Sequence, residues 1–121
     1  LEGIAMGTAQ VFETYEAIGQ NPKKIMAVGG GTKNNIWMQA TSDFSKIDQV
    51  VSEKSTGASY GNAFLAALAV GAVSQSDITR WNPPLSKIKT QHSTLHAEKN
   101  KLFRQLYESS KEIAHAVADS T

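Results

Sequence analysis

A run of three glycines is the part of the sequence whose residue types most directly suggest chemistry. Gly29, Gly30 and Gly31 follow the short apolar run Ile25–Val28 and precede polar residues that begin a helix at about Asn35. Glycine has no Cβ, so main-chain N–H groups in such a turn can approach a bulky anion closely. The N-terminus of the following helix adds partial positive charge. A strand, a glycine turn and a helix start in this order are typical of phosphate sites and point toward a nucleotide.

The glycine run also has a purely structural interpretation, because a tight turn needs glycines for its own dihedral angles. The run has neither the Gly-x-x-x-x-Gly-Lys-Ser/Thr spacing of a P-loop nor the Gly-x-Gly-x-x-Gly spacing of a dinucleotide site. Lys33, just after the glycines, could contact phosphate or simply be solvated. The local pattern leaves both interpretations open.

Two histidines and a few aromatic and polar residues are the remaining candidates for chemistry. His92 and His96 are four residues apart, the spacing of two metal ligands on a helix. The pattern lacks the glutamate of a His-Glu-x-x-His motif, and Thr94 between them is a residue type that caps helices. We therefore predict no metal site. Glu13, Glu16 and Asp48 show no arrangement of paired carboxylates for acid–base catalysis.

Several other residues have a functional and a structural reading. Trp37 and Tyr60 could flank an adenine ring, although aromatic residues on amphipathic helices more often belong to the core. Ser55 and Thr56 could approach a nucleotide from the opposite wall, or only form the loop before a helix. Asp43 is expected to be a surface carboxylate.

Composition limits the classes of function. The chain has 121 residues, 40% hydrophobic and 19% charged, with a net charge of +1, so it can form one domain or part of a larger one and has no basic field for nucleic acid. The absence of cysteine excludes disulfides and thiol chemistry and fits a cytoplasmic protein. The longest apolar stretch, Ala63–Val73, is too short to span a bilayer, and no signal peptide is visible, so no membrane partner is expected. Because Leu1 lies inside a helical pattern, we expect the sequence to be part of a longer chain.

Apolar spacing predicts an α/β layer structure with the order α-β-α-β-α. Apolar residues at helical spacing predict a first helix that stops at Gly19, and the face of the second helix is expected to carry Ile36, Trp37, Ala40 and Phe44. The predicted elements are a helix over Leu1–Gly19, a strand over Ile25–Val28, a helix over Asn35–Phe44, a strand over Gln49–Val51, a loop over 55–59 and a helix over Tyr60–Val73.

The sequence changes character after Val73. Trp81-Asn82-Pro83-Pro84 is predicted to be extended, because a residue before proline avoids the α region. A long amphipathic helix is predicted from about Thr94 to Ala118, with an apolar stripe of Leu95, Leu102, Phe103, Leu106, Tyr107 and Ile113. The stripe is expected to be buried on the α/β layer or on another subunit, and exposed strand edges and an apolar face predict that the isolated chain self-associates as a homo-oligomer.

Three motifs in order carry a resemblance to a known family. Glu2-Gly3-Ile4-Ala5, Val28-Gly29-Gly30-Gly31-Thr32-Lys33-Asn34 with Trp37-Met38-Gln39, and Gly57-Ala58-Ser59-Tyr60-Gly61-Asn62-Ala63 with Ala66-Ala67 together resemble the C-terminal part of FGGY-family carbohydrate kinases. The glycine triplet followed by lysine and a Trp-x-Gln helix is most similar to the xylulokinase-like branch. The resemblance covers about residues 1–73. The chain departs from the family at Ser59-Tyr60-Gly61-Asn62-Ala63, where Ala-Leu-Gly-Ala-Ala is common.

The resemblance implies an actin-like, ribonuclease-H-like ATPase fold, of which this chain is the C-terminal half of the second domain, followed by a long C-terminal helix. Its implied parts are the C-terminal part of the ATP-binding domain over residues 1–73, an extended, proline-containing connection over 74–93 and the amphipathic helix over 94–121. Carried over by position, the backbone of Gly30 and Gly31 meets the phosphates of ATP, which binds with Mg²⁺, and Asn34 contacts the adenosine moiety. Gly29 is more plausibly part of the turn itself.

The implied reaction is phosphoryl transfer from ATP to a hydroxyl of a xylulose-like ketose or a related sugar or polyol. The family's catalytic aspartate and most of its sugar contacts lie upstream of the matched region, so we expect this chain to supply the nucleotide side and not to catalyse alone. Two alternatives stay open. One is a non-catalytic nucleotide-binding or regulatory module with a kinase-like fold; the other is an unrelated α/β domain with a structural glycine turn, which would require three coincidental motifs.

Overall fold

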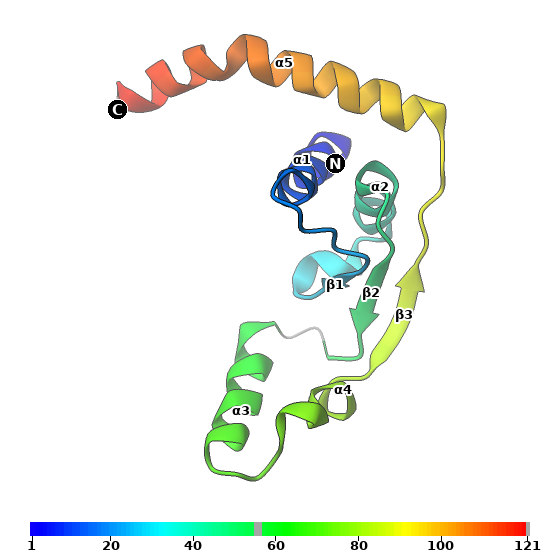
Figure 1. Cartoon of the computed structure of the whole chain (residues 1–121), viewed down its shortest axis with the longest axis vertical. Coiled ribbons are helices and arrows are strands. Elements are labelled where there is room, and N and C mark those ends of the chain that lie inside the picture. The colour runs from blue at the N-terminus through cyan, green and yellow to red at the C-terminus, as the bar shows by residue number, and fades with distance from the viewer. Residues whose placement is uncertain (55–56, 121) are drawn as a thin grey trace.

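The computed structural model describes residues 1–54 and 57–120. Helices and strands alternate in the order α1 (Glu2–Ala17), β1 (Ile25–Ala27), η1 (Gly30–Lys33), α2 (Asn35–Ser45), β2 (Gln49–Ser52), α3 (Ala58–Ala69), η2 (Gln75–Asp77), α4 (Ile78–Trp81), β3 (Pro84–Ile88) and α5 (Thr94–Asp119), where η marks a 3₁₀ helix. The strands form a three-stranded sheet in the order β1-β2-β3, with β1 parallel and β3 antiparallel to β2 (Figure 1). Within residues 1–54 and 57–120, no helix is both long enough and apolar enough to cross a membrane.

The core lies between α1 and α2. The Phe44 side chain is 3% exposed and packs with Ala5 and Ala9, whose small side chains let the two helices approach closely. The buried face of α2 consists of Met38, Thr41, Ser42 and Phe44. The prediction that Ile36 shares this face is wrong, because Ile36 is 74% exposed.

A buried polar network joins α2 to the sheet. Gln49 Nε2, on the fully buried strand β2, donates to the Met38 carbonyl and to Ser42 Oγ, the latter at 3.0 Å. Ser42 Oγ in turn donates to the Ile88 carbonyl on β3 at 3.4 Å. Since buried polar groups are costly unless they are hydrogen-bonded, this network fixes the position of α2 relative to both strands.

Glycines in the left-handed region end two helices. The predicted stop at Gly19 is confirmed: its φ is 80°, and the Gly19 and Gln20 N–H groups donate to the last carbonyls of α1. Gly71, with φ 72°, does the same after α3. The predicted span Tyr60–Val73 is therefore wrong at both ends, because Gly71 ends the helical run early and the helix begins directly after Gly57, at Ala58.

The segment predicted as an extended connection over 74–93 contains regular structure. Ser74 and Asp77 form a reciprocal capping box at η2, and α4 follows. The Trp81 ring lies 5.8 Å from Tyr60 and 5.5 Å from Phe64, between ring centroids, and so attaches α3 to this segment. The chain is then extended from Pro84, where β3 begins. The division of the chain at residues 73 and 93 stays a prediction.

Helix α5 crosses α1 and the end of α2, at the opposite end of the molecule from α3 and α4 (Figure 1). Its N-cap is Ser93, whose Oγ accepts from the Leu95 N–H, and not Thr94 as predicted. Asn100 Nδ2 donates to the Phe44 carbonyl at 3.0 Å, so its amide closes the C-terminal end of α2. Ion pairs of 2.7 Å from Lys99 to Glu2 and 3.0 Å from Arg104 to Glu13 tie α5 to α1.

The apolar stripe of α5 stays largely open. Leu102, Leu106 and Ile113 are 63–68% exposed, so of the two places expected to cover the stripe, the α/β layer of this chain does not cover it, and burial on another subunit stays a prediction. On the outer face of α1, Ile4 and Val11 are also more than half exposed. Exposed apolar surface of this kind marks contact sites between proteins.

We expect the isolated chain to self-associate through this surface. A double variant, Leu106→Glu with Ile113→Glu, should shift the protein toward monomer, because two charges would have to be buried in any contact that covers α5. Light scattering over a concentration series measures the mass. A matched double variant on the polar face of α5, Gln105→Glu with Ser109→Glu, controls for added charge. A wild-type chain that stays a monodisperse monomer throughout the series contradicts the prediction.

Candidate nucleotide site

The glycine turn joins the end of β1 to the start of α2. Gly29 has φ 88° and ψ −177°, a conformation essentially restricted to glycine. Its carbonyl accepts from the Thr32 N–H at 3.2 Å and from Thr32 Oγ1 at 2.7 Å. Gly29 therefore forms the turn, as the sequence indicated.

The surroundings of the next two glycines, Gly30 and Gly31, differ. Gly30 is exposed, and a Cβ built on it would meet no atom within 4 Å. A Cβ on Gly31 would lie 2.8 Å from Cζ3 of Trp37, closer than real side chains approach. Packing of the Trp37 ring thus explains glycine at position 31, whereas the fold leaves the space over Gly30 open to a ligand.

Asn34 is the N-cap of α2. Its Oδ1 accepts from the Trp37 N–H at 3.0 Å, which satisfies one of the free N–H groups of the first helical turn. The sequence interpretation assigned Asn34 only a ligand contact and missed this role, although asparagine directly before a helix is a strong capping signal. With the oxygen bonded to the helix, the side-chain amide nitrogen is the group through which Asn34 can still contact a ligand.

The turn borders a small cavity of about 200 Å³ between α1, β1 and α2, with Gly31, Trp37 and Gln49 in its lining. Pockets that enclose drug-sized ligands are generally larger, about 300–1,000 Å³. The cavity is therefore too small for a nucleotide, and Gly30 and Lys33 of the turn are exposed.

The aromatic candidates pack against different partners. Trp37 lies against Gly31, whereas the Tyr60 hydroxyl donates to the Trp81 carbonyl at 2.8 Å and its ring is tilted by 41° against that of the tryptophan. The structure thus gives each ring a packing role. The suggested approach of Ser55 and Thr56 to a nucleotide concerns residues outside the described part of the chain.

The remaining candidates are Asp43 on α2 and two histidines, His92 before α5 and His96 on it. Asp43, predicted as a surface carboxylate, is half-buried, and its Oδ1 accepts from Gln39 Nε2 at 2.8 Å and from the Gln91 N–H at 2.7 Å. His92 precedes α5, while the His96 ring lies 5.0 Å from that of Phe44, so the two do not share a helix as the spacing suggested. Within residues 1–54 and 57–120, no group of three His, Cys, Asp or Glu side chains could hold a metal ion.

Similarity to known proteins identifies the family of this chain. Residues 1–70 match the profile of the C-terminal domain of the FGGY family of carbohydrate kinases. A stretch of 71 residues is 30% identical to the xylulose kinase of Bacillus subtilis (strain 168); it covers 59% of this chain but only 14% of that protein.

Solved kinases share the fold. The chain superposes on a xylulose kinase from Rhodospirillum rubrum with a TM-score of 0.78 and 22% identity, covering 94% of this chain and 24% of that one. It superposes on Plasmodium falciparum glycerol kinase with ADP with a TM-score of 0.67 and 23% identity, covering 92% of this chain and 22% of that one. The fold is accordingly that of part of an actin-like ATPase domain with a long C-terminal helix, and the chain belongs to the FGGY family of carbohydrate kinases.

Proposed function

We propose that this chain supplies the nucleotide side of an ATP-dependent kinase that phosphorylates a hydroxyl of a xylulose-like ketose or a related sugar or polyol. The observation that carries the proposal is Gly30: it is exposed on a turn that leads into α2, and nothing in the fold occupies the space where its side chain would be. Membership of the family and the 30% identity to a xylulose kinase support the substrate class.

In the proposed reaction, the sugar hydroxyl oxygen bonds to the γ-phosphorus of ATP, the bond to the β–γ bridging oxygen breaks, and ADP leaves. The hydroxyl proton passes to a base. We assign that base and most sugar contacts to parts of the kinase beyond this chain, since the chain spans about a quarter or less of the relatives it matches.

The contribution of this chain is binding and orientation. The first N–H groups of a helix have no acceptor within the helix, so those of Gly30 and Gly31 at the start of η1 can donate to phosphate oxygens. Asn34 would contact the adenosine moiety through its amide nitrogen. Mg²⁺ would accompany ATP and offset the phosphate charge, and the kinase would act in the cytoplasm.

A MgATP titration by calorimetry tests this assignment. We expect weak binding by the wild-type chain and a loss of at least roughly tenfold in Gly30→Val, because the added side chain fills the space where the phosphates would lie. Gly7→Val is the matched control: it adds the same side chain on α1, where a Cβ also meets nothing within 4 Å. Equal affinity in a folded Gly30→Val variant would refute the site. If the chain alone shows no binding, the same pair is compared in a longer kinase that contains it.

The alternative function is a nucleotide-binding or regulatory module without catalysis. The contacts of Tyr60 favour this alternative function, because Tyr60 packs on Trp81 at a position where the family commonly has a smaller residue. Phosphate release or transfer measured on the longer protein with D-xylulose distinguishes the two: turnover supports the kinase, and binding without turnover supports the module.

A further inference from the structure

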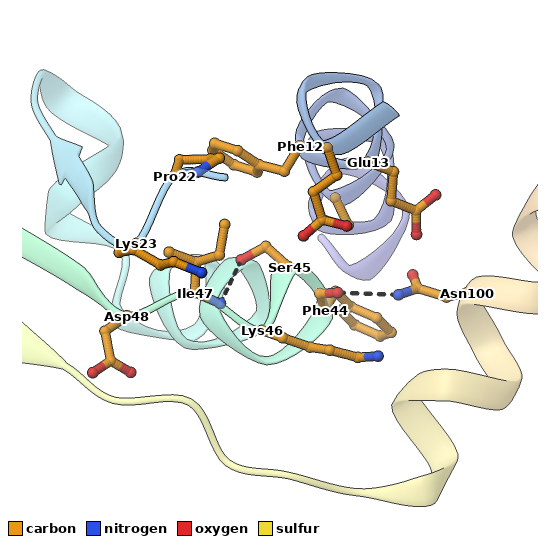
Figure 2. Close-up of a pocket in the computed structure, with 12 residues that line it drawn as sticks. Phe12, Glu13, Pro22, Lys23, Phe44, Ser45, Lys46, Ile47, Asp48 and Asn100 are labelled. Carbon is orange, nitrogen blue, oxygen red and sulfur yellow. Dashed lines mark hydrogen bonds between the residues drawn. The ribbon is translucent and has the colours of Figure 1, made fainter. Parts of the chain in front are cut away.

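A second cavity lies at the far end of α2 from the glycine turn. Its volume is about 400 Å³, within the range of small-molecule sites. Four separate parts of the chain surround it: α1, the segment around Lys23, the end of α2 and Asn100 of α5 (Figure 2). Because α2 has 11 residues, this cavity and the turn are about 16 Å apart along the helix axis. We call it the α2 C-terminal pocket.

Two of the charged side chains at this pocket are already neutralised. Glu13 pairs with Arg104 at 3.0 Å, and Asp48 pairs with Lys87 at 2.8 Å. The Lys87 ammonium, together with the Thr90 N–H, holds the pKa of Asp48 below its usual value, so this carboxylate stays ionised and bound to its partners.

Three charged side chains at the pocket have no such partner. Within residues 1–54 and 57–120, no ion pair engages Lys23, Lys46 or Glu16. Lys23 and Lys46 both line the pocket, and Figure 2 shows that they come from different parts of the chain, Lys23 beside Pro22 and Lys46 at the end of α2. Two ammonium groups and one carboxylate give the pocket a net positive charge, which favours an anion that also carries hydrogen-bond donors.

Lys46 occupies a position where glycine would be easier. Among the described residues, Lys46 is the non-glycine residue with a positive φ, 60°. It ends α2 in the left-handed conformation. This conformation is strained for an L-residue because its Cβ comes close to the following carbonyl oxygen. The backbone strain places an ammonium group at the pocket that glycine, the usual residue at such a helix end, would not supply.

The uncharged lining suits a hydroxylated carbon skeleton. The Phe12 ring provides an apolar wall. Asn100 is 9% exposed, and since its Nδ2 is bonded to the Phe44 carbonyl, its Oδ1 is the group that can accept from a ligand. Glu16 offers two further acceptor oxygens. We propose that the α2 C-terminal pocket binds a small phosphorylated polyol, with Lys23 and Lys46 on the phosphate and Glu16 and Asn100 on the hydroxyl groups.

Calorimetry on this chain tests the proposal with D-xylulose 5-phosphate as the probe. We expect saturable binding that weakens by about tenfold in Lys46→Gly and in Lys23→Gln, because each variant removes a charged hydrogen bond to the phosphate. Lys46→Gly also relieves the strained backbone, so it should fold at least as well as the wild type. Lys101→Gln, an exposed lysine of α5, controls for the change in net charge and should bind within about twofold of the wild type.

Two further titrations define the ligand class and separate this pocket from the nucleotide site. Inorganic phosphate and D-xylulose should each bind more weakly than the ester, since each keeps only half of the contacts. MgATP affinity should be the same in Lys46→Gly as in the wild type, so a failure at one site is not mistaken for a failure at the other. No saturable binding of the ester, an equal loss in Lys101→Gln, or phosphate binding as tightly as the ester would overturn the proposal.

Discussion

Phe44→Ala is expected to lower the free energy of unfolding by about 3–5 kcal/mol, the cost of removing a buried aromatic side chain. Phe44 is 3% exposed, fills the space between Ala5 and Ala9, and contacts the His96 ring of α5. Small alanine side chains cannot move in to fill the vacated volume. Since a domain of this size is stabilised by only about 5–15 kcal/mol, the variant should lose a large fraction of its stability and unfold at a clearly lower urea concentration. Urea denaturation followed by circular dichroism measures the change.

Ile36→Ala is the matched control for this experiment, because it truncates an aliphatic residue of the same helix that is 74% exposed. Its effect should stay within about 0.5 kcal/mol, as for other surface substitutions. A comparable loss in both variants would show that the core does not lie between α1 and α2.

The second large effect is expected at Gly29. Gly29→Ala should cost about 1–3 kcal/mol, because φ 88° with ψ −177° is closed to residues that carry a Cβ. Gly30→Ala, one residue further on, has no positive φ and open space at its Cβ, so its effect on stability should stay within about 0.5 kcal/mol. Thermal unfolding of the two variants under one set of conditions provides the comparison.

The pair also separates structure from binding. Gly30→Val is expected to lose MgATP while the fold survives, whereas Gly29→Ala loses stability first. If Gly30→Ala destabilises the chain as much as Gly29→Ala does, Gly30 is part of the turn itself, and the ATP titration no longer reports on phosphate contact.

The elements that the sequence predicts correctly are those whose own residues encode them. Apolar residues at helical spacing and the stop at Gly19 specify α1, and a short apolar run before the glycines specifies β1. Strand β3 escaped prediction because its residues are mostly exposed; pairing with the buried β2, and not its own hydrophobicity, makes it a strand. The exposure of Ile36 likewise depends on where α1 lies.

The glycine turn and its position before α2 could be read from the sequence, but the separate reasons for its glycines could not. Gly31 is required by the ring of Trp37, a contact that exists only once α2 begins at Asn35. The α2 C-terminal pocket gave no local signal at all, because it brings together Phe12, Lys46 and Asn100, which are far apart in the chain.

The attachment of α5 sets an order of assembly for the chain. Its bonds to α1 join residues 97 and 91 positions apart, from Lys99 to Glu2 and from Arg104 to Glu13. Closing loops of this length costs chain entropy before any contact compensates for it, whereas α1, α2 and the β1–β2 pair meet over much shorter separations. The glycine turn can therefore reach its final shape on a ribosome-bound chain in which α5 has not yet been made. The α2 C-terminal pocket needs Asn100 of α5 and is completed only afterwards.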